Sequence, residues 1–173
     1  MTGPDRKPVS SAAATTPAPS APVVLPKTSE SSQLLKIRHS MSHVMAMAVQ
    51  QLFPKARVTI GPWTESGFYY DFDNPDPFTE ADLKAIKKGM IKIINKKAPL
   101  ERVEVTRAEA ETKIKAQNEP YKLEILEGLQ EPITLYTLGD EWWDHCAGPH
   151  AQHTGQHNAN AVQLASVAGT YCR

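Results

Sequence analysis

A long amphipathic segment near the start of the chain is the strongest constraint on its fold. Apolar residues recur at helical spacing over residues 32–53, and Pro54 ends the pattern. The pattern predicts a long helix with one apolar face that must be covered by other elements. The chain of 173 residues is long enough for one domain with a buried core, which we expect at residues 32–173.

Shorter patterns downstream predict alternating strands and helices. Two capping signatures, Thr79-x-x-Asp82 and Thr106-x-x-Glu109, mark helix starts. Strand pairs interleaved with helices are typical of an α+β domain, and we expect a two-layer sandwich in which a largely antiparallel sheet packs against helices. The predicted strands are residues 57–60, 67–73, 100–105, 132–138 and 141–146, and the further predicted helices lie at 79–97, after Thr106 and at 121–126.

The first 31 residues have a different composition. They are rich in Pro, Ser, Thr and Ala, contain no aromatic residue and have one short apolar run. Such a segment cannot bury enough surface to fold, so residues 1–31 are predicted to be a disordered tail. The same composition fits a plastid transit peptide, so a plastid stands as the alternative to the cytoplasm. No run of eighteen consecutive apolar residues occurs, and we expect no membrane association.

Charge and cysteine content do not point to a particular class of protein. The formal net charge is +0 at pH 7, so bulk charge does not indicate a nucleic-acid-binding surface. Two cysteines do not support a disulfide-stabilised fold. Function must therefore be inferred from local clusters of residues.

Two such clusters contain histidine and cysteine. His39 and His43 are four residues apart, on one face of the first predicted helix. Cys146 and His150 follow a predicted strand directly. Together the four have the ligand types and number of a zinc site. They fit equally well in a metal-free pocket, where imidazoles position water and neighbouring groups stabilise an oxyanion.

Several stretches of the chain resemble successive signatures of the editing domain of threonyl-tRNA synthetases, bacterial and cyanobacterial in type. The resemblance covers about residues 34–171 and implies hydrolysis of serine wrongly attached to tRNA(Thr). It implies no required metal, although zinc remains an alternative. Zinc-binding alanyl-type editing domains carry Cys-Gly-Gly-Thr-His where this chain has Cys-Ala-Gly-Pro-His. The matching stretches are residues 39–43, 59–62, 67–73, 119–126 and 148–150.

The resemblance also implies roles for individual residues. The imidazoles would handle protons, and Lys122 would stabilise negative charge or polarise water. Asp144 would hold the substrate ammonium or orient a histidine. Cys146 is expected to line the pocket rather than act as a nucleophile, since nothing in the sequence indicates a lowered pKa. The implied catalytic residues are His39, His43, Lys122, Asp144, Cys146 and His150, and Tyr70 is the implied substrate-binding residue.

The implied partners are the acceptor end of tRNA(Thr) carrying serine and the remainder of a threonyl-tRNA synthetase. The sequence stops at Arg173, where the family continues into a class II catalytic core. We therefore expect a fragment of a synthetase or a free-standing protein that edits in trans. Two alternatives stay open: a zinc-dependent alanyl-type editor of Ser-tRNA(Ala), and a non-catalytic tRNA-binding remnant. His145, His153 and His157 add imidazoles near Cys146 in the sequence and weaken the metal-free expectation.

Overall fold

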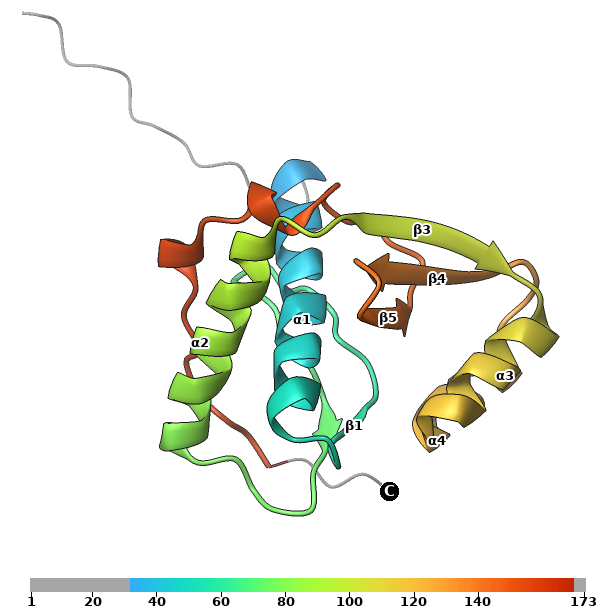
Figure 1. Ribbon diagram of the computed structural model, residues 1–173, viewed down its shortest axis with the longest axis horizontal. Coiled ribbons are helices and arrows are strands. Elements are labelled where there is room, and N and C mark those ends of the chain that lie inside the picture. The colour runs from blue at the N-terminus through green and yellow to red at the C-terminus, as the bar shows by residue number, and fades with distance from the viewer. Residues whose placement is uncertain (1–31, 170–173) are drawn as a thin grey trace, which may run out of the picture.

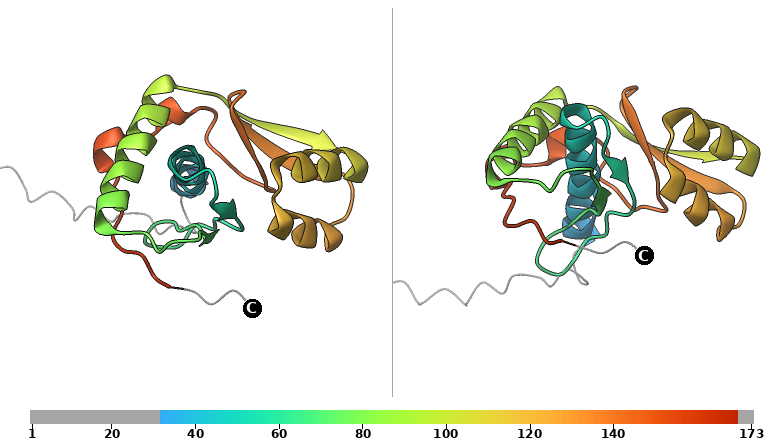
Figure 2. Two further views of the ribbon diagram at one scale, coloured as in Figure 1. Left: turned by 60° about the horizontal axis from the view of Figure 1, so that its bottom comes forward. Right: turned by 90° about the horizontal axis from the view of Figure 1, so that it is seen from below.

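The helix α1, Ser32–Leu52, runs through the middle of the molecule. Seen along its axis, α1 has the helix α2, Glu80–Lys96, on one side and strands with two further helices on the other (Figure 2, left). The computed structural model describes residues 32–169, so the predicted tail at 1–31 and the last four residues lie outside the described residues. The predicted helix at 32–53 is confirmed to within one residue.

The two long helices pack closely because small residues face each other. A Cβ atom added at Gly89 of α2 would lie 3.2 Å from the Cβ of Ala48 on α1, tighter than ordinary van der Waals contact. Val44 of α1 and Met90 of α2 are fully buried in the same apolar core. Removing such side chains from water supplies the main stabilisation of the pair.

Both predicted capping boxes are present. The Thr79 hydroxyl accepts from the backbone N–H of Asp82 (3.3 Å), and the Asp82 carboxylate accepts from the backbone N–H of Thr79 (2.8 Å). Thr106 and Glu109 make the same reciprocal pair at the start of α3. These bonds satisfy donors that a helix start leaves free. The helices that follow are α3, Arg107–Gln117, and α4, Pro120–Glu127.

All strand pairs are antiparallel, but they form two separate sheets. The first has shorter strands than predicted. Beyond them the two segments stay paired by single hydrogen bonds, such as the one from the Asp71 N–H to the Ile60 carbonyl (3.0 Å). The second sheet has the order β3-β4-β5. The strands are β1, Arg57–Val58, β2, Phe72–Asp73, β3, Leu100–Val105, β4, Ile133–Leu138, and β5, Trp142–His145.

The buried apolar residues form two clusters, a larger one and a smaller one. The larger cluster joins α1, α2 and β1 with Leu138 and Trp142. The smaller one holds α3 and α4 against β4, and Figure 1 shows this helix pair set apart from α1 and α2. The chain is thus an α+β fold, as predicted. Over residues 32–169, no helix combines the length and the apolar character needed to cross a membrane. The smaller cluster consists of Ala110, Ile114, Leu126, Ile133 and Leu135.

Candidate functional site

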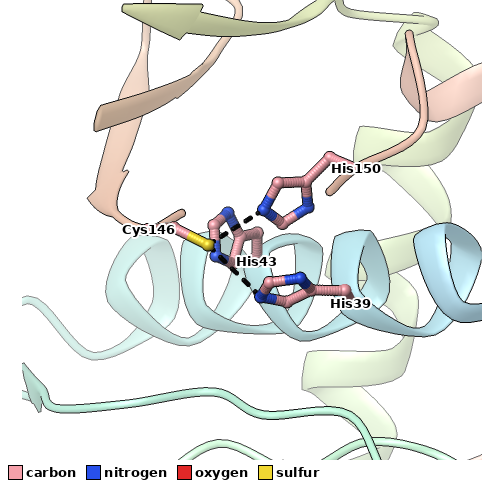
Figure 3. Close-up of side chains that lie close together, drawn as sticks. All are labelled: His39, His43, Cys146 and His150. Carbon is pink, nitrogen blue, oxygen red and sulfur yellow. Dashed lines mark hydrogen bonds between the residues drawn. The ribbon is translucent and has the colours of Figure 1, made fainter. Parts of the chain in front are cut away.

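Four side chains that are far apart in the sequence meet beside α1. His39 and His43 project from successive turns of α1, while Cys146 and His150 come from the loop after β5 (Figure 3). One nitrogen or sulfur atom of each lies within 4.8 Å of those of the other three. The Cys146 Sγ is 3.3 Å from Nε2 of His39 and 3.2 Å from Nε2 of His150. The structure therefore brings together the two clusters found in the sequence.

Neighbouring groups determine which ring nitrogen of His150 carries its hydrogen. The Ser40 hydroxyl donates to the Lys36 carbonyl (2.8 Å), so its oxygen is left to accept from Nδ1 of His150 (3.2 Å). Nε2 of His150 therefore presents a lone pair to Cys146. Burial lowers the pKa of His150 far below its usual value, so this ring is neutral at pH 7.

The other two imidazoles are oriented in the same way. Nδ1 of His39 lies 3.2 Å from the Pro149 carbonyl, which can only accept, so Nε2 of His39 also faces Cys146 with a lone pair. Nε2 of His43 points at the Asp144 carboxylate (3.5 Å), and its Nδ1 is buried without a hydrogen-bond partner. One thiol hydrogen is thus surrounded by three neutral rings, each with an unprotonated nitrogen.

A buried carboxylate lies beneath these rings. Oδ1 of Asp144 accepts from Lys122 Nζ (2.8 Å) and from the backbone N–H of His145 (2.7 Å). Oδ2 accepts from the Tyr70 hydroxyl (2.6 Å) and faces His43. Three donors and the contact with His43 thus surround a carboxylate that is 3% exposed. The contact with His43 is the arrangement that a role in orienting a histidine requires.

The Lys122–Asp144 pair is more buried than a position at the pocket edge requires. Lys122 is 1% exposed and Asp144 3%. Burial alone would raise the pKa of Asp144, but the charge of Lys122 and its hydrogen bond hold that pKa below its usual range. Asp144 points inward because β5 alternates, with Trp142 and Asp144 on its buried face.

The Cys146 side chain is also neutral, as a protonated thiol. Burial raises the pKa of its thiol to about 12, so the thiolate is scarce at pH 7. This agrees with a pocket-lining role rather than a nucleophilic one. The thiol is fixed by the N–H of Gly148 (3.2 Å), and a Cβ at Gly148 would fall 2.5 Å from the Tyr136 hydroxyl. Only glycine fits at that position, where φ is +78°.

Comparison with known proteins identifies the family. The chain is 91% identical over 173 residues to a threonine–tRNA ligase of Parasynechococcus marenigrum (strain WH8102) and 85% identical over 173 residues to one of Synechococcus sp. (strain CC9605). It belongs to the threonine–tRNA ligase family. A ligase of Thermosynechococcus vestitus is 65% identical over 153 residues, which is 88% of the chain and 25% of that relative. No protein-family model matches the chain.

The match covers the whole of this chain but only part of each ligase. All of this chain is covered by the first two relatives, but it spans only 28% of the length of each. The identity therefore assigns the chain to one region of a threonine–tRNA ligase. This match does not by itself assign the activity or the substrates of a whole ligase to the chain.

In this member of the ligase family, the four clustered side chains form a group that can hold a metal ion. Tetrahedral zinc with nitrogen and sulfur ligands requires ligand separations of roughly 3.3 to 3.8 Å, from bond lengths of about 2.0 to 2.3 Å. The Cys146 contacts are close to this range. His39 and His150 each use the second ring nitrogen for a hydrogen bond, as metal-bound histidines do. The buried, unpartnered Nδ1 of His43 also fits a ligand.

The three additional histidines do not join this group. His157 is buried on another side of α1, where its Nδ1 contacts the Thr154 carbonyl (2.8 Å). It lines a cavity of about 910 Å³ that none of the four clustered residues line. Tyr70 also lines that cavity, although its hydroxyl reaches Asp144. We place the chemistry at the cluster rather than in the larger cavity because the titratable groups converge there.

Sequence reasoning missed the residues that orient the site. Ser40 lies inside the His39–His43 motif, yet its role depends on His150, 110 positions away. It also accepts from the backbone N–H of Ala151 (2.8 Å). The ring of Trp142 lies 5.4 Å from that of His43. The only sequence feature that could have indicated this role is the position of Ser40 between His39 and His43.

Acid should destabilise the folded chain through His43. Burial lowers its pKa to about 4 from 6.5, so between these values the unfolded chain binds a proton that the folded chain does not. Stability is complete above pH 6.5 and falls as the pH drops toward 4. At pH 5 the free energy of unfolding should be about 2 kcal/mol lower than at pH 7 from His43 alone. Urea titrations at both pH values measure this.

Proposed function

We propose that this chain hydrolyses the ester bond between serine and tRNA(Thr), as a proofreading module of a threonyl-tRNA synthetase. The supporting observation is the meeting of three neutral imidazoles over a buried Lys122–Asp144 pair, in a chain whose relatives are threonine–tRNA ligases. Ester hydrolysis needs a base for water and an acid for the leaving group. Neutral imidazoles can serve as both.

His39 is the proposed proton acceptor. It is half-buried, whereas His43 and His150 are buried. The single thiol hydrogen of Cys146 can bond to only one of the two Nε2 atoms that face it. When it bonds to His150, the Nε2 of His39 is available to a water. The water oxygen attacks the ester carbonyl while its proton passes to His39. When the bond to the ribose oxygen breaks, that oxygen takes the proton from His39. Free serine and tRNA result.

The buried residues would act by orientation. Nε2 of His43 lies 3.5 Å from the Asp144 carboxylate, which would favour the hydrogen on Nε2 and leave a lone pair on the buried Nδ1. Lys122 contacts Asp144 and has 1% of its surface exposed, so we assign it the support of Asp144 rather than direct contact with substrate. Tyr70 would likewise act through its hydrogen bond to Asp144.

Such a module would be needed because a threonine-selective site discriminates weakly against serine. A site that selects threonine gains only about 1 to 3 kcal/mol from the methyl group that serine lacks. Serine is therefore attached at a rate that translation cannot tolerate. A separate pocket that admits the serine ester and excludes the extra methyl removes the wrong product and leaves the correct one.

A metal-assisted version of the same reaction is the second candidate. His39, His43, Cys146 and His150 would hold the ion, and the observation in its favour is the set of lone pairs converging on one thiol. A bound zinc ion would lower the pKa of a water and polarise a carbonyl. Asp144 and Ser40 would orient His43 and His150 toward it.

Deacylation of three charged tRNAs tests these proposals. With this chain, Ser-tRNA(Thr) should lose its amino acid much faster than Thr-tRNA(Thr) or Ser-tRNA(Ala), and a chelator should change neither the rate nor the melting temperature. Loss of activity on chelation would favour the zinc-assisted reaction. Preference for Ser-tRNA(Ala) would indicate an alanyl-type editor. Binding of tRNA without release of serine would indicate a non-catalytic remnant.

A further inference from the structure

Lys122 lies where the two apolar clusters meet. It belongs to the first turn of α4, which packs with α3 in the smaller cluster. Its partner Asp144 faces α1 and the larger cluster. The Lys122–Asp144 contact therefore depends on how firmly the start of α4 is held against α1 and β1.

Glu119, the residue before α4, makes that connection. It occupies the N-cap position but does not cap its own helix. Its side chain turns away, and the residue is 2% exposed. Oε1 accepts from Nε2 of Gln50 on α1 (2.6 Å), and Oε2 accepts from the backbone N–H of Val58 on β1 (3.1 Å). One carboxylate thus joins the start of α4 to two elements of the larger cluster.

The hydrogen bonds continue from Gln50 to Trp142, whose ring lies beside the site. Oε1 of Gln50 accepts from the indole N–H of Trp142 (2.7 Å). The Trp142 ring lies 5.5 Å from Nζ of Lys122 and 5.4 Å from the ring of His43. Because its oxygen is held by the indole N–H, Gln50 must present its NH₂ group to Glu119. Residue 119 therefore has to accept at both of its side-chain atoms, which a carboxylate does and an amide cannot.

We propose that Glu119 is a positioning residue for the site: through Gln50 and Val58 it holds α4 so that Lys122 stays paired with Asp144. This rests on the proposed hydrolysis only for its kinetic consequence. Glu119 touches no substrate, and its effect reaches the reacting groups through Lys122 and Asp144. A displacement of about 1 Å in such a support can cost up to a hundredfold in rate.

An exchange of two residues tests the hydrogen-bond geometry. Glu119→Gln keeps the shape but puts an NH₂ group against a donor, and Gln50→Glu puts two carboxylates together. In the double variant the direction of one bond is reversed. The new amide at position 119 accepts from the Val58 N–H and donates to the new carboxylate at position 50, which also accepts from Trp142. The weak bond from Gln50 to the Ala56 carbonyl (3.4 Å) is lost in the exchange.

Two measurements on the native chain and these variants give the expected results. Each single variant should lower kcat for Ser-tRNA(Thr) by roughly tenfold to a hundredfold with KM unchanged, and the double variant should recover most of it. Acylation of Lys122 by an acetylating ester, followed by mass spectrometry, should be slow in the native chain, faster in each single variant and slow again in the double variant. The acylation readout holds even if the chain hydrolyses no ester, so it separates this proposal from the proposed function.

A matched control separates positioning from stability. Glu109→Ala removes two hydrogen bonds from the exposed capping box of the neighbouring helix α3. It should lower the melting temperature and leave both kcat and Lys122 acylation unchanged. The proposal is overturned if Glu119→Gln leaves Lys122 acylation at the native level, or if the double variant does not restore it. If Glu119→Gln does not fold, Gln50→Glu and the double variant give the same comparison.

Discussion

Replacing His39 with alanine should slow the hydrolysis of Ser-tRNA(Thr) about a hundredfold or more, the usual cost of removing one acid–base group. The Nε2 of His39 is the proposed acceptor of the water proton, and its Nδ1 is held by the Pro149 carbonyl. Since His39 is half-buried, the fold should tolerate the change. Single-turnover deacylation with purified Ser-tRNA(Thr), with circular dichroism to verify folding, measures the effect.

The control for His39 must be a histidine outside the cluster. His157 is unsuitable because it is 7% exposed and its Nδ1 contacts the Thr154 carbonyl, so its removal would disturb the core. His153 is half-buried and contributes no atom to the cluster. His153→Ala should keep the native rate. Equal losses in the His39 and His153 variants would show that the cluster is not the site of hydrolysis.

Replacing Lys122 with methionine should cost about 3 to 5 kcal/mol of folding free energy, because it leaves the buried Asp144 carboxylate without its cation. That is a large part of the roughly 5 to 15 kcal/mol typical of a domain. Lys122 is 1% exposed, so the charge it leaves behind has little access to water. Urea unfolding of the native and variant chains gives the difference.

The pairing itself can be isolated from the loss of Lys122. Adding Asp144→Asn to Lys122→Met removes the stranded charge, so the double variant should be more stable than the sum of the two single losses implies. Lys115→Met is the surface control: Lys115 and Glu111 are 61% and 46% exposed at their side chains, and its effect should stay within about 1 kcal/mol. Strictly additive losses at Lys122 and Asp144 would contradict the pairing.

The elements of this fold that depend on local sequence were predicted well. The end of α1 at Pro54 and both capping boxes are set by neighbouring residues, and the structure confirms them. The division into two sheets was not predicted, because strand pairing depends on contacts between distant segments. For the same reason the short extent of β1 and β2 was not predicted.

The candidate site divides in the same way. Spacing placed His39 with His43 and Cys146 with His150, but it could not show that Lys122 and Asp144 lie under the rings rather than at the pocket edge. Nor could it find supports such as Ser40 and Glu119, whose partners lie 110 and 69 positions away. Their side chains are of ordinary polar types, so only the folded arrangement distinguishes them.

The elevated pKa of Cys146 has a consequence for how the protein withstands oxidants. Peroxides and alkylating agents attack the thiolate, and a thiol whose pKa is about 12 is ionised in roughly one molecule in 100,000 at pH 7. A low-pKa cysteine in the same place would be converted to sulfenic acid during oxidative stress, and its bulk and new hydroxyl would block the three rings. By keeping the sulfur protonated, the burial of Cys146 makes it a poor target for such damage.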